Sequence, residues 1–150
     1  MKEYYIHLFE YNDWANKLIL EKLKASPDVN PKTLSIFSHI IISQILWLNR
    51  VRKESYEFKD FWQMLNIKDL DNLSLRSTRA WIAFINDEDE KSLELLYTYT
   101  NSKGVKYSNT LAQIVTHVIN HSTYHRAQTA LLLREENIQP PLTDYIAFFR

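Results

Sequence analysis

The stretch that does most to decide the fold is residues 110–136, TLAQIVTHVINHSTYHRAQTALLLREE, which contains neither glycine nor proline. Its apolar residues recur at helical spacing, and Leu111, Ile114 and Val118 fall on one face of a helix with 3.6 residues per turn. A pair of prolines at 140–141 then stops helical structure. The stretch therefore predicts one long amphipathic helix.

Three earlier segments repeat apolar residues with the same period and predict helices at residues 4–23, 32–53 and 70–85. On the first helix, the predicted buried stripe comprises Leu8, Tyr11, Ala15, Leu18 and the aliphatic stem of Lys22. The second helix is apolar nearly all round, with three consecutive isoleucines at 40–42. We expect it to be buried centrally, or to be buried on one side and paired with another subunit on the other.

The connections between these helices differ in character. Residues 55–65 place aromatic side chains among charges and predict a packed loop with one helical turn. Residues 93–107 alternate aromatic and polar side chains around Gly104, the only glycine, and predict a β-hairpin or an extended loop whose turn needs a positive φ. The last residues are apolar enough to pack back on the helices. The predicted fold is all-α, a single-domain four-helix bundle over residues 1–150 with this hairpin between helices 3 and 4.

Composition excludes several classes of function. Lys and Arg together number 18, as do Asp and Glu, so no net charge attracts nucleic acid or an anionic membrane. The chain has no cysteine, which excludes thiolate nucleophiles and Cys-based zinc sites, and one glycine is too few for a phosphate-binding loop. Neither a secretory signal nor an 18-residue apolar segment is expected. These features predict a cytoplasmic protein that acts on a small molecule and binds neither nucleic acid nor membrane.

Histidines supply the candidate functional residues. His117, His121 and His125 are spaced four apart on the last predicted helix, so neighbouring Cβ atoms lie about 5 to 6 Å apart and two imidazoles can share an ion. The outer two are separated by about 12 Å along the axis, which prevents all three from binding one ion easily. Helical angles place His121 and His125 on the apolar side and His117 at its edge. His121 and His125 are the predicted pair of metal ligands, and His117 is expected at the rim.

A third ligand must come from another helix, and His39 is the remaining histidine in a predicted core helix away from the N-terminus. Three histidine ligands would leave one position open, as in catalytic zinc sites. The alternative is that these side chains are ordinary hydrogen-bonded histidines, although two buried imidazoles without a shared ion need separate partners. For His7, a simple surface role is the better interpretation.

Other conspicuous residues favour structural roles. Trp14, Trp47 and Trp81 are predicted to pack in the bundle. Arg126 and Gln128 flank His125 and could reach a substrate or partner, but solvated or structurally paired side chains are the more common outcome in mid-helix. No Ser-His-Asp order and no close carboxylate pair is evident, so no catalytic residue is assigned beyond the metal ligands.

The sequence resembles the DinB-like (damage-inducible protein) family in residues 117–128 and 140–145, in Tyr11 to Asn16 of the first helix, and in the isolated His39. The resemblance spans essentially the whole chain. It implies a four-helix bundle of metalloprotein type, commonly a homodimer, with ligands matching His39, His121 and His125. Ala127 and Asn137 stand where family members usually have glycine. The family name refers to induction after damage and implies no contact with DNA.

Two functional hypotheses follow. The first is a metal-dependent enzyme, either a hydrolase or a thiol-dependent transferase, in which one divalent ion binds a water or a thiol at its open position. Zinc and nickel are the expected ions. The second is a noncatalytic homodimeric bundle with a structural or stress-response role, which the metal merely stabilises.

Overall fold

Hydrogen-bonding side chains mark where three of the four long helices begin. Asn30 and Asn66 each accept a hydrogen bond from the backbone N–H two residues later. Thr110 and Gln113 form a reciprocal capping box. Such side chains satisfy backbone N–H groups that have no partner within the helix. The third helix therefore begins at Ile67, three residues before the predicted start.

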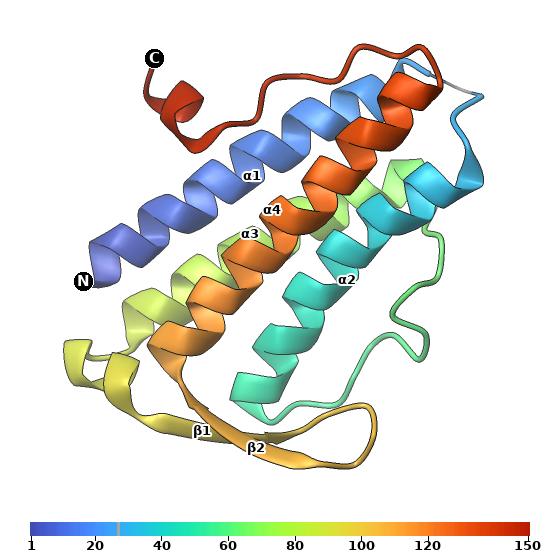
Figure 1. Ribbon diagram of the computed structural model, residues 1–150. Coiled ribbons are helices and arrows are strands. Elements are labelled where there is room, and N and C mark those ends of the chain that lie inside the picture. The colour runs from blue at the N-terminus through green and yellow to red at the C-terminus, as the bar shows by residue number, and fades with distance from the viewer. Residues whose placement is uncertain (27) are drawn as a thin grey trace.

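The structure, a computed structural model, describes residues 1–26 and 28–150. It shows four helices and a two-stranded antiparallel hairpin between the third and fourth (Figure 1). The long helices are α1 (Lys2–Lys24), α2 (Pro31–Arg52), α3 (Ile67–Asp87) and α4 (Leu111–Glu135). The strands are β1 (Leu96–Thr100) and β2 (Lys106–Thr110), and the short 3-10 helices are η1 (Glu90–Glu94) and η2 (Tyr145–Phe149). The predicted all-α class with a hairpin before the last helix is confirmed.

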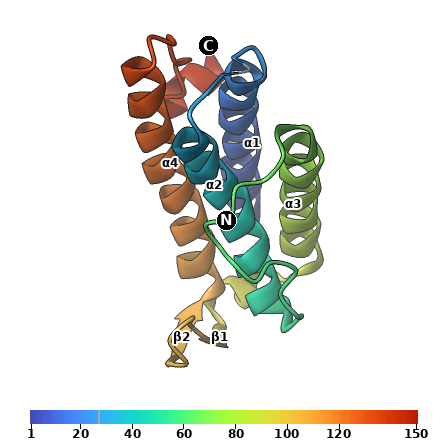
Figure 2. The same cartoon turned by 90° about the vertical axis from the view of Figure 1, so that its right-hand side faces the viewer.

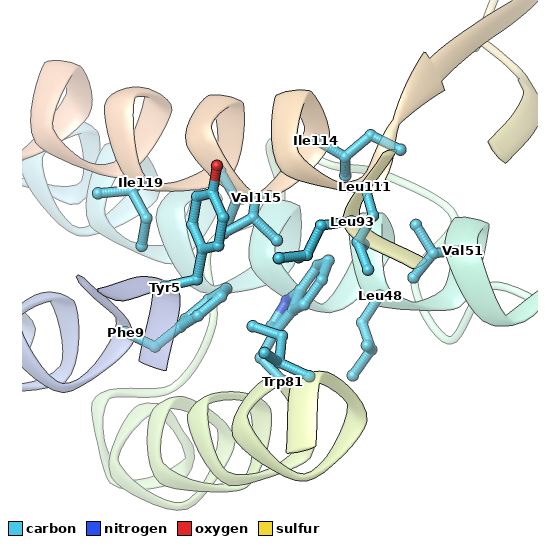
Figure 3. Close-up of a cluster of buried hydrophobic side chains, with 12 residues drawn as sticks. Tyr5, Phe9, Leu48, Val51, Trp81, Leu93, Leu111, Ile114, Val115 and Ile119 are labelled. Atoms are coloured by element: carbon cyan, nitrogen blue, oxygen red, sulfur yellow. The ribbon is translucent and has the colours of Figure 1, made fainter. Parts of the chain in front are cut away.

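The helices pack so that α2 lies mainly against α4 and α1 mainly against α3, with α1–α4 and α2–α3 contacts closing the bundle (Figures 1 and 2). The apolar interior has two clusters. One surrounds Trp81, whose indole stacks on Phe9 at a centroid distance of 5.1 Å, and is drawn in Figure 3. The other cluster lies around Phe37, Ile19 and Leu70. Both clusters combine residues from all four helices, so burial of apolar area holds the bundle together.

The predicted buried stripe of α1 was partly wrong. Tyr11 and Ala15 are buried, but Leu8 and Leu18 are half-buried and Lys22 is exposed. The residues that α1 buries are Tyr5, Phe9, Tyr11, Asn12, Ala15, Asn16, Ile19, Leu20 and Leu23. The observed buried face is rotated about the helix axis from the predicted one. It includes Asn12 and Asn16, which a prediction based on apolar residues alone does not count as buried.

The expectation of no long apolar segment was also wrong. Among the described residues, α2 is the one helix long and apolar enough to cross a membrane by length and composition alone. Within the bundle, 67% of an 18-residue stretch of this helix is buried. Its apolar character matches the predicted central position, since a helix buried on most sides needs apolar side chains all round.

The hairpin and the tail follow the sequence closely. Tyr99 pairs with Tyr107 in the antiparallel ladder, and Gly104 in the turn has a φ of 78°. The tail returns from the end of α4 across α1 (Figure 1), where the Tyr11 hydroxyl donates to the carbonyl of Thr143 at 2.8 Å. Trp14 is half-buried there, with its ring 5.6 Å from that of Phe148.

A buried arginine joins α4 to α1. Arg126 is 2% exposed, and its Nη1 donates to the side-chain oxygens of Asn12 and Asn16. Its Nη2 donates to the hydroxyls of Tyr11 and Thr123, at 3.3 and 2.9 Å. In the described part of the chain, no carboxylate is paired with this guanidinium. Neutral oxygens therefore replace the water that the buried cation has lost.

The same polar network continues to the other two helices. The Asn12 amide donates to Gln44 Oε1 at 2.8 Å, and Gln44 Nε2 donates in turn to Ser77 Oγ and Thr78 Oγ1 at 3.0 and 3.2 Å. The indole N–H of Trp81 donates to the backbone carbonyl of Gln44 at 2.9 Å. All four helices are thus joined by hydrogen bonds through one buried layer.

We expect Arg126→Ala to lower the free energy of unfolding by about 3 kcal/mol or more, because several buried oxygens lose their donor at once. Urea unfolding followed by circular dichroism measures the change. Arg134→Ala on the exposed side of α4 is the matched control and should have little effect. Equal losses in the two variants would contradict the structural importance of the buried layer.

Candidate metal centre

Two neighbouring helices bring three histidines together. His39 lies in the first half of α2, and His121 and His125 lie one turn apart on α4, which packs along α2. Their ring nitrogens include a set of three, one from each residue, that all lie within 4.8 Å of one another. The Nε2 atoms of His39 and His121 are 3.2 Å apart. The cluster predicted from sequence is present and could hold a metal ion.

Hydrogen bonds orient two of the three rings. The Nδ1 of His39 is 2.7 Å from the carbonyl oxygen of Phe61, and the Nδ1 of His125 is 2.7 Å from Oε1 of Gln128. Both oxygens are acceptors, so each Nδ1 carries the proton and each Nε2 is left with a lone pair. This arrangement, with the outer nitrogen donating to an oxygen, is typical of metal-binding histidines.

Burial keeps His39 and His121 neutral. The pKa of His121 is lowered to about 3, chiefly by burial and also by the neighbouring imidazoles. Burial also lowers the pKa of His39, against the raising effect of its hydrogen bond to Phe61, with His125 adding to the lowering. Neutral imidazole is the form that binds a metal ion. Three imidazole nitrogens suit a divalent ion of intermediate softness, so the residues present fit the metal ion that the family resemblance implies.

The remaining histidines lie outside the cluster, as predicted. His117 is one turn before His121, with ring centroids 5.6 Å apart, and its other neighbour is Trp47 at 4.9 Å. Burial lowers the pKa of His117, and the charge of Arg50 lowers it further. His7 has a side chain 59% exposed and lies 3.8 Å from Glu10 on the surface of α1.

The residues flanking His125 have structural partners. Gln128 accepts from the His125 ring, and Arg126 belongs to the buried layer described above. Of the two readings that the sequence left open for this pair, structural pairing is the one observed.

Sequence reasoning missed several residues that touch the cluster. Trp62 and Phe61 lie in the loop between α2 and α3, and no helical spacing relates them to a histidine 22 or 23 positions away. Ser43 Oγ lies 3.3 Å from His39 Nε2. Its position one turn after His39 on the same helix was a usable signal.

Comparison with known proteins fits this arrangement. The sequence matches the DinB family over residues 1–150. The chain belongs to the DinB family. Protein DinB of Bacillus subtilis (strain 168) is 26% identical over 162 residues, an alignment that covers 97% of this chain and 93% of that protein. The resemblance seen in the sequence is therefore confirmed along the whole chain.

The two departures from the DinB family pattern are accommodated by the fold. Asn137 has a φ of 60°, the left-handed conformation that asparagine tolerates after a helix. Ala127 lies on the exposed side of α4, so its methyl group needs no space in the core.

We expect the metal-free DinB-family protein to lose stability as the pH falls from about 6.5 toward 3. The pKa of His121 in the folded chain is about 3, below its ordinary value of 6.5. Between pH 6.5 and 3 the unfolded chain therefore binds more protons than the folded chain, so lowering the pH lowers the free energy of unfolding. Urea unfolding in chelator at several pH values measures the slope.

Carboxylates also titrate in this range, so the test compares variants. Between pH 6.5 and 4.5 the free energy of unfolding should decrease less in His121→Gln than in the wild type. The control His7→Gln, on the exposed surface, should retain the wild-type slope. Parallel slopes for all three proteins would contradict the assignment.

Proposed function

We propose that the protein is a metal-dependent enzyme in which His39, His121 and His125 hold one divalent ion, zinc or nickel. The observation that carries the proposal is the convergence of three ring nitrogens within 4.8 Å, from two helices, in a buried setting. The reaction is the hydrolysis of a small molecule or the transfer of a thiol to one. An ion held by three protein ligands keeps a position at which a water or a thiol becomes a better nucleophile.

The chain's own residues prepare this centre in two ways. The carbonyl of Phe61 and the amide oxygen of Gln128 hold the protons of two imidazoles on the nitrogens that face away from the cluster. Burial keeps His39 and His121 neutral, so an incoming cation need not displace protons from either ring at neutral pH. Both effects lower the cost of binding the ion.

Two observations favour catalysis over a purely structural metal. Structural zinc sites are normally closed by four protein ligands, whereas the group found in the described part of the chain consists of three histidines without a carboxylate. The helices are also joined independently by the hydrogen bonds of the Arg126 layer. The bundle therefore has its own internal links and does not need the ion to hold α2 against α4.

The association of two copies and the cytoplasmic location stay predictions. Light scattering coupled to gel filtration measures the first, with twice the 17.9 kDa chain mass as the expected result.

Purified wild-type protein should contain one equivalent of a divalent metal per chain. The His121→Ala, His125→Ala double variant should contain almost none, because a single imidazole cannot retain the ion through purification. His7→Ala is the control and should match the wild type. Elemental analysis by mass spectrometry gives the answer, and equal metal in all three proteins would remove the basis of the proposal.

The metal-loaded protein should turn over small electrophiles, and comparing rates with and without a low-molecular-weight thiol separates transferase from hydrolase. His125→Ala should lower the activity by more than the roughly 10- to 100-fold that is typical when a residue supporting a metal ligand is replaced. A noncatalytic bundle predicts the opposite pattern. Its ligand variants would melt at lower temperature, while added metal would produce no turnover of any substrate tested.

A further inference from the structure

An indole covers one side of the histidine cluster. The rings of Trp62 and His39 are stacked, with centroids 3.7 Å apart and planes 2° from parallel. Trp62 also contacts His125 edge to face, at a centroid distance of 5.6 Å and an angle of 80°. One side chain from the loop between α2 and α3 thus touches two of the three clustered imidazoles.

Hydrogen bonds fix this part of the loop to α2. The carbonyl of Trp62 accepts from Ser35 Oγ at 2.7 Å, one turn before His39, and its N–H donates to Asp60 at 2.9 Å. The carbonyl of Phe61, the residue before Trp62, accepts from His39 itself. The indole is therefore held in place by its own backbone and does not merely rest on the imidazole.

The fold does not account for Trp62. Its exposed fraction is 52%, whereas Trp81 in the core is fully buried, and Trp62 belongs to neither apolar cluster. In this half-exposed position Trp62 buries much less of its apolar area than Trp81 does. Its defined contacts are those with the two histidines.

We propose that Trp62 is a positioning residue that sets the plane of the His39 ring, an inference that rests on the proposed metal site. The single hydrogen bond at Nδ1 leaves the imidazole free to tilt about that bond. Stacking on a fixed indole removes this freedom and directs Nε2 toward His121. Without the indole, the ring can tilt toward Ser43 Oγ, which already lies 3.3 Å from the same nitrogen.

The affinity test measures Zn²⁺ binding by competition with a chromophoric chelator. Trp62→Ala should bind Zn²⁺ about 10- to 100-fold more weakly than the wild type, as is usual when a residue that orients a ligand is lost. Trp62→Phe keeps a flat ring and should restore most of the affinity. Met64→Ala is the matched control because Met64 lies in the same loop and is 53% exposed. It should bind as the wild type does.

Two further readouts separate positioning from a general effect on folding. The visible spectrum of bound Co²⁺ should change in Trp62→Ala and stay unchanged in Met64→Ala, while the metal-free melting temperatures of the two variants should be similar. In metal-free protein, the ring protons of His39 should resonate upfield because they lie over the indole, and Trp62→Ala should move them back.

The outcomes are distinguishable. Wild-type protein that binds no Zn²⁺ overturns the proposed function and this inference with it. Zn²⁺ binding by the wild type with equal affinity in Trp62→Ala overturns the inference alone. Full affinity in Trp62→Leu also overturns it, since leucine covers the imidazole without stacking on it.

Discussion

The buried guanidinium of Arg126 is the constraint on which the rest of the structure depends. A cation inside an apolar bundle must be surrounded by oxygens, and Asn12 and Asn16 supply them from α1. Asn12 in turn bonds Gln44 on α2, next to Ser43 at the edge of the histidine cluster. Arg126 directly follows His125. The network that fixes the register of α4 against α1 and α2 therefore also fixes where along the helix axes the imidazoles meet.

Much of this architecture could be predicted from the sequence, because periodic apolar residues and helix-breaking residues act locally. The four helices, the hairpin around Gly104 and the pair His121 and His125 came from spacing. His39 was chosen because it is the remaining histidine in a predicted core helix away from the N-terminus. The buried face of α1 did not, since Asn12 and Asn16 are polar and are buried only because a partner on α4 receives them. A pattern of apolar residues contains no information about such pairing across helices.

The contacts made by the loop between α2 and α3 could not be predicted, for a different reason. Trp62 lies in a segment without helical or strand periodicity, so nothing in its sequence position indicates which helix it will cover. Its placement depends on a hydrogen bond from Ser35, which forms only once the loop has folded against α2. The capping asparagine at position 66 was a readable signal, and it sets where that loop ends.

The separation of the histidines along the chain has a consequence for the order of assembly. His121 and His125 are neighbours as soon as α4 forms one continuous helix, but His39 is 82 residues before His121 and joins them only when α2 docks. Closing so long a segment has an entropic cost that local helix formation avoids. The histidine pair on α4 can therefore form early in folding, whereas the three-histidine cluster is complete only after α2 has docked.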